Sequence, residues 1–539
     1  MIPHIYLPYK CVFCVLFPYL KDAQPKKVYI SSMKKAALIL IVLTLLVGTL
    51  FANGTPEDQK FFEELLKNNQ STGYTTGTTA SSTSSKGSEI ISRDMATLER
   101  LYQYVEKNYL YDIDYDAVYE AMATALFEAL GDKYTYYVTA EDSDDYEEEV
   151  SGTYGGLGIY FSKTYVDYQD IDDESTIYAI ITQVFPNTPS SKAGLKAGDY
   201  IIEIGGESVV EMEATECAKR MKGEPGTSVE LTIKRGETIF KIDITRAIIT
   251  VPTVEYEMIE GTNTAYLRIL EFSSSTYKAI AEALDTLSKA GMEKLIIDLR
   301  DNPGGDVDVT LAIADLFISN NKLLSISYKD TSKNVTYVAN NGVTVSPDVE
   351  VAILTNGGTA SSAEIFSSAM KDNGRAVLFG TTTYGKGVMQ VISSFGDGYT
   401  SITTASFVGP SGKTIHGEGV EPDYEIEEIV VEDEELDAYT ELLNSKAVET
   451  FVDQNPDYTD ANIRKFAAEQ AGTGIREIVL LLVARNEYLS RMNYDDRPLS
   501  DIVYDNVCKE AFDYLQTYEN NNGQSVTPNS GTNNRVVNF

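Results

Sequence analysis

Histidine is almost absent from this chain of 539 residues, which contains only His4 and His416. Most hydrolytic sites use an imidazole as the base that activates a nucleophile. A hydrolase that depends on histidine is therefore nearly excluded by the residue inventory.

Cysteine is also scarce. Cys11 and Cys14 lie close to the N-terminus, in a segment that we do not expect to be translated, which leaves Cys217 and Cys508. These two are far apart in the sequence, so we expect two separate thiols and no disulfide framework. The sequence shows no cluster of metal-ligating residues and no phosphate-binding loop ahead of a helix. We therefore expect neither a metal nor a cofactor.

Positive charge is under-represented as well. The chain has 44 Lys and Arg residues against 81 Asp and Glu residues, which gives a formal net charge of -37. This balance argues against nucleic acid and against anionic membrane surfaces as partners. The length and a hydrophobic content of 43% are sufficient for two or three domains.

The N-terminal region has the pattern of an export signal. Two lysines follow Met33, an apolar run occupies residues 36–50, and Ala52 provides a small residue at a cleavage site. We expect translation to start at Met33, with residues 1–32 an untranslated leader and 33–52 a signal peptide. The rival interpretation is a membrane tether through residues 36–52, but the run is short for a span of about twenty residues. Either way we expect an extracytoplasmic protein, periplasmic or secreted.

The block from 351 to 390 contains the most informative residues. A continuous apolar run at 351–354 predicts a buried parallel strand, and a second run follows at 376–379. Ser361 comes after the glycines that end the first strand. Small and apolar residues then recur at helical spacing: Ala363, Phe366, Ala369 and Met370. Ser361 is thus predicted at the carboxyl end of a sheet and the start of a helix, where free N–H groups can stabilise an oxyanion.

Lys386 stands twenty-five residues after Ser361, between two glycines. A serine beside an unprotonated lysine can attack a carbonyl without histidine. The free lysine pKa of about 10.4 must fall towards about 7, which burial can achieve. We expect Tyr384 and Val388 to provide an apolar setting, and no contact with Asp372, which would raise the pKa. Taken alone, the pair would more often be an unrelated serine and a surface lysine.

Three segments give the pair a context. They are residues 359–365 (Thr-Ala-Ser-Ser-Ala-Glu-Ile), 372–376 (Asp-Asn-Gly-Arg-Ala) and 383–390 (Thr-Tyr-Gly-Lys-Gly-Val-Met-Gln). This series resembles the catalytic core of the C-terminal processing proteases, the tail-specific serine peptidases of the S41 type. The resemblance implies that Ser361 is the nucleophile, that Lys386 is the general base and that Gln390 positions the lysine. Ser362 follows directly, which leaves a shift by one residue open, although the spacing to Lys386 favours Ser361.

Residues 295–305 (Leu-Ile-Ile-Asp-Leu-Arg-Asp-Asn-Pro-Gly-Gly) are similar to another block of that family. The residues themselves predict a buried strand that ends in a tight turn. We expect the N–H of Gly305, in preference to that of Gly304, to form an oxyanion hole with the N–H of Ser362. His416 lies between two closing segments that also resemble the family, and we expect it to be a loop residue.

A second module precedes this core. Residues 155–161 (Gly-Gly-Leu-Gly-Ile-Tyr-Phe) resemble the carboxylate-binding loop of a PDZ domain, and residues 189–199 contain its Ala-Gly-Leu-x-x-Gly-Asp turn. In such domains successive N–H groups hold a terminal carboxylate while the peptide adds as a strand. The resemblance assigns this loop to Gly156, Leu157, Gly158 and Ile159, within a PDZ domain at 151–248.

These segments predict an α/β protein with a ClpP/crotonase-like serine protease core and an inserted α+β PDZ domain. The expected order is a flexible linker at 53–88, a helical segment at 89–150, with a helical pattern over 98–130, the PDZ domain, the core at 249–427, a helical C-terminal extension at 428–518 and a disordered tail at 519–539. Within the core, residues 276–290 have the pattern of a helix.

The resemblance implies an exported serine endopeptidase that needs no cofactor and captures unstructured or apolar C-termini of protein substrates. The terminal helices are expected to form a homodimer or to bind an adaptor. One rival is a catalytically silent PDZ scaffold, against which the intact Ser361, Lys386 and Gln390 argue. Another is a ligand carrier built on the same core fold, like the retinoid-carrying proteins, against which the PDZ module argues.

Overall fold

The computed structural model describes residues 83–518, except for 144, 145, 147, 149–151, 166–173, 340, 341 and 493–495. The predicted leader, signal peptide and C-terminal tail, and the linker up to residue 82, lie outside the described residues. The chain divides into two compact units, whose described residues are 83–119 and 120–518. Within the described ranges no helix is both long enough and apolar enough to cross a membrane.

The smaller unit contains α3 (Thr83–Asn108) and the start of α4 (Tyr115–Glu128). The helical pattern expected over 98–130 corresponds to two helices with an interruption between them. The interruption has a local cause, because Asp114 Oδ1 accepts the N–H of Ala117 at 3.0 Å and so caps a new helix. Helix α3 also begins before the expected end of the linker at residue 88, since a nucleated helix extends through weak helix formers.

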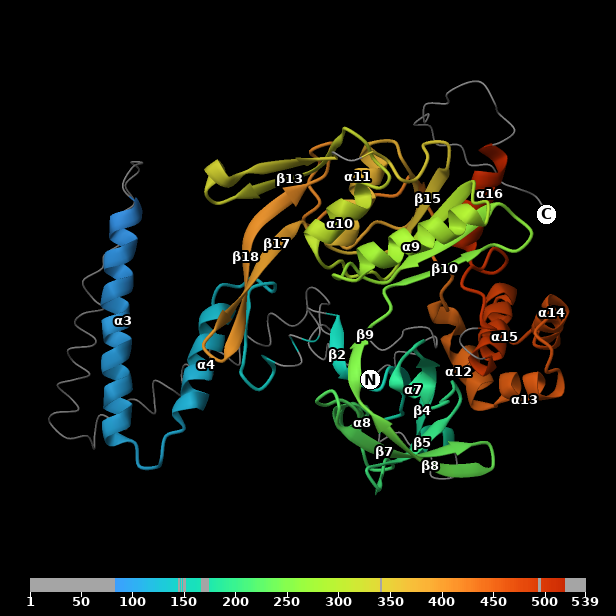
Figure 1. The fold of residues 1–539 in the computed structure, drawn as a ribbon, viewed down its shortest axis with the longest axis horizontal. Coiled ribbons are helices and arrows are strands. Elements are labelled where there is room, and N and C mark those ends of the chain that lie inside the picture. The colour runs from blue at the N-terminus through green and yellow to red at the C-terminus, as the bar shows by residue number, and fades with distance from the viewer. Residues whose placement is uncertain are drawn as a thin grey trace. The chain divides into compact units, whose positions relative to one another are not determined.

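The core of the larger unit is a six-stranded sheet in the order β10-β11-β12-β15-β16-β19 (Figure 1). β11, β12, β15, β16 and β19 run parallel, and β10 is antiparallel to β11. The predicted strands at 351–354 and 376–379 are confirmed. The bounds are Val254–Met258 for β10, Thr264–Ile269 for β11, Lys294–Asp298 for β12, Glu350–Thr355 for β15, Val377–Gly380 for β16 and Tyr424–Glu425 for β19.

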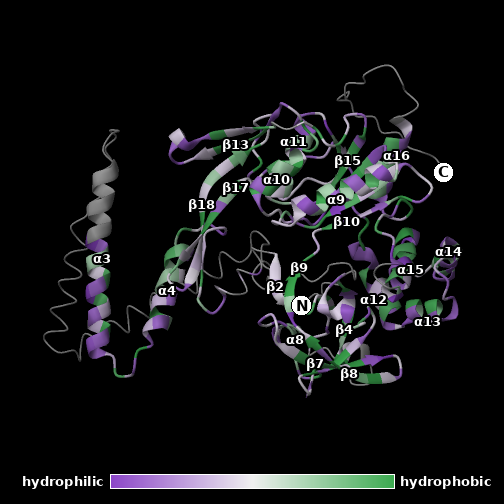
Figure 2. Ribbon diagram, in the orientation of Figure 1, coloured by the Kyte–Doolittle hydropathy of each residue, from purple (hydrophilic) through white to green (hydrophobic). Residues whose placement is uncertain are grey.

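Helices cover both faces of this sheet. One face packs against α9 (Thr276–Lys289), α10 (Val307–Ala314) and α11 (Ser362–Asp372). The expected helix at 276–290 is thus confirmed as α9. Alternate strand residues point to each face, so that Ile353 packs with the first helices while Leu354 packs with α16 (Asn506–Tyr518). The hydrophobic colouring of α10 in Figure 2 agrees with its buried position.

Helix α16 belongs to the predicted C-terminal extension, yet it closes the second face of the core sheet. Its fully buried residues are Val507, Cys508, Ala511 and Leu515. Cys508 and Cys217 are both buried free thiols, so the expectation of two lone cysteines is confirmed. The sheet therefore depends on residues that lie far beyond the segment in which the catalytic motifs occur.

A second sheet carries the segment that follows α4. Its order is β1-β18-β13-β14, with β17 also paired to β18. The register places Tyr136 opposite Ser401, which holds the preceding residues 131–135 beside β18. The bounds are Tyr136–Val138 for β1, Lys322–Tyr328 for β13, Val335–Val338 for β14, Val388–Phe395 for β17 and Gly398–Val408 for β18.

The predicted PDZ region forms its own sheet, in the order β3-β4-β5-β7-β8 with β6 paired to β5. The helices α6 (Glu174–Ile177), α7 (Pro189–Lys192) and α8 (Ala214–Met221) accompany it, and Cys217 on α8 lies in its core. A separate ribbon pairs β2 (Thr153–Gly156) with β9 (Ala247–Thr250). The remaining bounds are Ile159–Ser162 for β3, Ala179–Val184 for β4, Tyr200–Ile204 for β5, Glu207–Ser208 for β6, Ser228–Arg235 for β7 and Thr238–Thr245 for β8.

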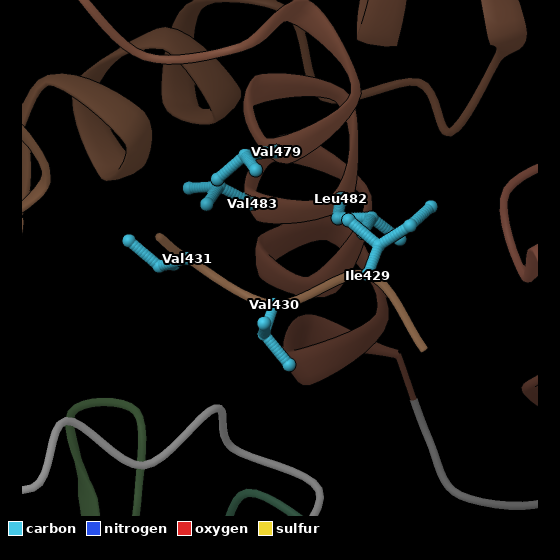
Figure 3. Close-up of a pocket in the computed structure, with 6 residues that line it drawn as sticks. All are labelled: Ile429, Val430, Val431, Val479, Leu482 and Val483. Atoms are coloured by element: carbon cyan, nitrogen blue, oxygen red, sulfur yellow. The ribbon is translucent and has the colours of Figure 1, made fainter. Parts of the chain in front are cut away.

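Four helices between the core and α16 enclose a hydrophobic core of their own. These helices lie within the predicted helical C-terminal extension at 428–518. The bounds are Leu436–Asn444 for α12, Ala447–Gln454 for α13, Asp460–Glu469 for α14 and Glu477–Arg491 for α15. Figure 3 shows a small pocket in this region, between the segment 429–431 and α15. Only aliphatic side chains line it, so it offers no group for chemistry: Ile429, Val430, Val431, Val479, Leu482 and Val483.

Candidate active site

Ser361 occupies a strained position between β15 and α11. Its backbone has φ 55° and ψ -118°, a region that non-glycine residues rarely adopt and that is often found at functional sites. Ser361 immediately precedes Ser362, the first residue of α11. The predicted placement at the carboxyl end of a parallel strand and the N-terminus of a helix is therefore present.

The turn after β12 lies directly against this serine. A Cβ atom added to Gly304 would stand 2.7 Å from both Ser361 Cβ and Ser362 N, so only glycine fits at this position. The buried side chain of Asn302 fixes the turn: Nδ2 donates to the carbonyl of Ile269 at 2.7 Å, and Oδ1 accepts the N–H of Gly304 at 2.8 Å. The turn is therefore held rigidly beside Ser361.

The two N–H groups expected to form an oxyanion hole are both available. In the described part of the chain, neither Gly305 N nor Ser362 N has a hydrogen-bond acceptor, whereas Gly304 N is bound by Asn302. The hydroxyl of Ser362 is fully buried and donates to the carbonyl of Gly305 at 2.8 Å. The Ser362 side chain is therefore already engaged, which favours Ser361 as the nucleophile.

A buried carboxylate joins the serine loop to the lysine loop. Glu364 is fully buried, and its Oε2 accepts the N–H groups of Ser361 at 2.8 Å and of Lys386 at 2.7 Å. Its Oε1 accepts the N–H of Gly385 at 2.7 Å and the hydroxyl of Thr383 at 2.5 Å. Four donors thus satisfy a charge that would be very costly to bury alone.

Sequence reasoning did not assign this role to Glu364. Its local signal is a glutamate three residues after a serine at a helix start, which is the spacing of a capping box. That signal predicts the bond to Ser361 N. It does not predict that the chain returns twenty residues later to bring Gly385 and Lys386 to the same carboxylate.

Lys386 lies half-buried in the loop between β16 and β17. A Cβ atom added to Gly387 would stand 2.4 Å from His416 N, which explains the glycine after the lysine and places His416 in a structural loop contact. Burial lowers the pKa of Lys386, and the positive charge of Lys133 lowers it further, while Tyr384 and two carboxylates oppose the shift. This is the direction that a general base requires.

The side chains of Ser361 and Lys386 do not hydrogen bond to each other in the described structure. Lys386 Nζ instead lies 5.0 Å from the centre of the Tyr134 ring, a cation–π distance. The amide of Gln390 donates to Thr403 Oγ1 at 3.0 Å and not to Lys386. Asp372 accepts the N–H of Ser411 at 2.8 Å, in a contact that does not involve the lysine.

The segment 131–135, which lies within the predicted helical segment 89–150, contributes further residues to this site. Lys133 Nζ donates to the hydroxyl of Tyr384 at 2.6 Å and lies 4.8 Å from the centre of the Tyr134 ring. Asp132 accepts the N–H of Tyr134 at 3.0 Å and the hydroxyl of Thr135 at 2.7 Å. No sequence pattern links residue 133 to residue 384, which are 251 positions apart.

An ion network anchors the strand that leads to the glycine turn. Arg300 NH2 donates to Asp298 at 2.6 Å and to Asp505 at 2.7 Å. Burial alone would raise the pKa of Asp298, but the charge of Arg300 lowers it overall. Because Asp505 also accepts the N–H groups of Val507 and Cys508, the arginine connects the glycine turn to the start of α16.

The predicted carboxylate loop of the PDZ region joins β2 to β3. Gly158 has φ +81°, and a Cβ there would stand 2.4 Å from Thr188 Cβ. The carbonyls of Leu157 and Gly158 accept the N–H groups of Ser190 and Phe185, both at 3.0 Å. Gly156 ends β2 and Ile159 begins β3, and β3 is the edge strand of its sheet among the described residues.

Two family models match this chain. The model of peptidase family S41 matches residues 263–426, and a PDZ domain model matches residues 180–235. The first match falls within the predicted core and the second within the predicted PDZ region.

The sequence is also similar to proteins that carry related names. It is 31% identical over 333 residues to the carboxy-terminal processing protease CtpA of Bacillus subtilis, a match that covers 61% of this chain and 68% of that protein. It is 31% identical over 336 residues to a CtpA-like serine protease of Staphylococcus saprophyticus, covering 62% of this chain and 66% of that protein. The chain thus spans slightly less than two thirds of the staphylococcal relative. Among solved structures, the photosystem II D1 C-terminal processing protease matches with 23% identity and a TM-score of 0.35, covering 61% of this chain and 86% of that one.

Proposed function

Because this chain belongs to peptidase family S41 and contains a PDZ domain, we propose that it is a C-terminal processing serine endopeptidase with a Ser361–Lys386 dyad. The observation that carries the proposal is the shared carboxylate of Glu364, which brings the backbones of the serine and the lysine together. The lowered pKa of Lys386 supports its role as the base.

The chemistry requires the uncharged amine of Lys386 to leave the Tyr134 ring and reach Ser361 Oγ. The amine then accepts the hydroxyl proton while the oxygen attacks the substrate carbonyl. The resulting ammonium returns this proton to the leaving amine, which produces an acyl-enzyme. In the second half, Lys386 accepts a proton from water, the hydroxide releases the acyl group, and the proton returns to Ser361.

The oxyanion of each tetrahedral intermediate would bind the free N–H groups of Gly305 and Ser362. Their position at a glycine turn and a helix N-terminus, both without acceptors among the described residues, supports this assignment. Gln390 would act as a positioning residue. Gln390 donates to Thr403, and Thr403 N donates to Thr135 in the segment that contains Tyr134. These two bonds support an indirect effect of Gln390 on the position of Lys386, through the Tyr134 segment.

The PDZ domain would capture unstructured or apolar C-termini of protein substrates at Gly156, Leu157, Gly158 and Ile159. The free edge of β3 supports the addition of a peptide strand. The sequence of residues 33–52 supports export to an extracytoplasmic location. This segment would either be cleaved off or tether the protein to the membrane through residues 36–52. The terminal helices would form a homodimer or bind an adaptor.

A silent PDZ scaffold is the second candidate, and the missing contact between Ser361 and Lys386 side chains favours it. Cleavage of casein by residues 53–539 separates the two. We expect activity in the parent chain, loss in Ser361→Ala and in Lys386→Ala with unchanged thermal unfolding, and residual activity in Ser362→Ala. Activity that survives Ser361→Ala contradicts the dyad. A chain that stays inactive with peptides that have free apolar C-termini supports the scaffold.

A further inference from the structure

Two lysines share one aromatic ring at the candidate site. Lys133 Nζ lies 4.8 Å and Lys386 Nζ lies 5.0 Å from the centre of the Tyr134 ring. The two nitrogens are therefore no more than about 10 Å apart, within roughly one Debye length of each other. They come from segments separated by about 250 residues.

The side chain of Lys133 is exposed but anchored. Its ammonium donates to the Tyr384 hydroxyl at 2.6 Å and lies 4.9 Å from the centre of that ring. The backbone around it is fixed as well, because Asp132 binds Tyr134 N and Thr135 Oγ1, and β1 continues the segment into the sheet. The lysine is thus held at its position by both its side chain and its main chain.

We propose that Lys133 is a positioning residue for the reaction of the Ser361–Lys386 dyad: its anchored ammonium is the cationic neighbour that favours the uncharged amine of Lys386. This inference rests on the proposed function and adds to it the group that activates the base. A nearby cation is one of the recognised ways to activate a lysine, in addition to burial.

The two lysines differ in the direction of their shifts. The hydrogen bond to Tyr384 raises the pKa of Lys133, whereas burial lowers the pKa of Lys386. When two like charges compete, the group with the higher pKa retains its proton. The proton therefore stays on Lys133, and Lys386 is the amine that becomes neutral. Two groups whose environments separate their pKa values in this way are typical of catalytic sites.

Other charges around Lys386 act in the opposite direction, which explains why a second cation is useful. Tyr384 on the same loop, Asp132 on the 131–135 segment and Glu364 on α11 all favour its ammonium form. His416 is on the loop that packs against Gly387, and its ring lies 6.5 Å from that of Tyr134. It is one of the groups that lower the pKa of Asp132. Lys133 is the cation that opposes these groups at Lys386.

The test is the pH dependence of kcat/KM for a fluorogenic peptide, measured with the full chain. For Lys133→Met we expect the acid limb to move to higher pH by about half to one unit, which lowers kcat/KM near neutral pH by about three- to tenfold. Lys133→Arg keeps the charge and should keep most of the acid limb in place. Lys278→Met removes the same charge from the exposed face of α9 and serves as the control for net charge.

An acid limb that stays in place in Lys133→Met overturns the inference, and so does an equal movement in Lys278→Met. A purely structural role of Lys133 would lower kcat/KM at every pH without moving the limb.

A second readout does not require turnover. In Ser361→Ala, the rate at which acetic anhydride modifies Lys386, followed by mass spectrometry across a pH series, reports its protonation directly. We expect the midpoint to rise when Lys133→Met is added, and an unchanged midpoint overturns the inference. Failure of the proposed function has a different signature, because the parent chain would then be inactive or its proteolysis would survive Ser361→Ala, whatever the Lys386 midpoint shows.

Discussion

Ser361 and Lys386 donate their backbone N–H groups to the same oxygen atom, Oε2 of Glu364, at 2.8 and 2.7 Å. The two loops that carry the proposed nucleophile and base are therefore fixed by one buried atom. In the described structure the two side chains are not hydrogen bonded to each other, so the carboxylate links the two loops through their backbones.

Replacing Glu364 by glutamine tests this relationship. The amide has one oxygen in place of two, so at least one N–H donor would face an NH2 group. We expect a loss of about 2–4 kcal/mol in the free energy of unfolding, since buried donors would remain unsatisfied, and at least a hundredfold loss in kcat/KM. Urea unfolding and peptide cleavage measure the two effects. Thr383→Val removes one of the four donors, together with the acceptor of the Val420 N–H, and should lower kcat/KM less; an equal effect on kcat/KM would argue against the shared-oxygen account.

The glycine after the lysine offers a steric test. Gly387→Ala would place a Cβ atom 2.4 Å from His416 N, so one of the two loops must move. We expect kcat/KM to fall at least tenfold, with a smaller change in stability because the loops can separate. Gly357→Ala is the matched control, since its Cβ meets nothing within 4 Å. A Gly387→Ala variant as active as this control would show that the lysine loop tolerates displacement.

The helical region before α16 should have its own acid sensitivity. Hydrogen bonds from Arg476 lower the pKa of Glu435 to about 2, from an ordinary value of 4.5. A lowered folded-state pKa stabilises above pH 4.5, and this contribution is lost as the pH falls from 4.5 towards 2. We expect a loss on the order of 1 kcal/mol after allowance for solvent screening. Thermal unfolding of the parent chain and Glu435→Gln at pH 7 and pH 3 measures it. The unfolding temperatures of the two chains should differ at pH 7 and lie closer together at pH 3. A difference that is the same at both pH values contradicts the prediction.

Helix α16 should stabilise the core from its second face. Leu515 is fully buried among residues of the central sheet, so Leu515→Ala should cost about 2–5 kcal/mol in the free energy of unfolding. Glu510→Ala changes an exposed position on the same helix and should cost less than about 0.5 kcal/mol. If urea unfolding gave similar values for both, α16 would not be part of the core.

Local patterns predicted the elements around Ser361 correctly. The apolar run of β15 and the helical spacing of Ala363 and Phe366 both depend on neighbouring residues, which a sequence displays directly. The motif of residues 359–365 added the family, and hence the fold. The helical pattern over 98–130 does not give the position of the break between α3 and α4, which the capping side chain of Asp114 sets.

Such local patterns do not predict long-range contacts. Periodicity shows that a helix has an apolar face but not which surface it covers, so α16 was placed outside the core. The same limit applies to Lys133, whose meeting with Tyr384 depends on how β1 pairs with β18. The assignments of Lys386 and Ser361 to one site came from the family resemblance, and Glu364 supplies the physical link between them.

The contact of α16 with the sheet has a consequence for the timing of maturation. Tyr266 and Leu515 belong to one hydrophobic cluster, although about 250 residues separate them in the sequence. A chain that emerges from its N-terminus exposes Ser361 and Lys386 well before it delivers the helix that covers the back of their sheet. The nascent chain therefore carries all the proposed catalytic residues on a sheet whose second face is still uncovered by α16.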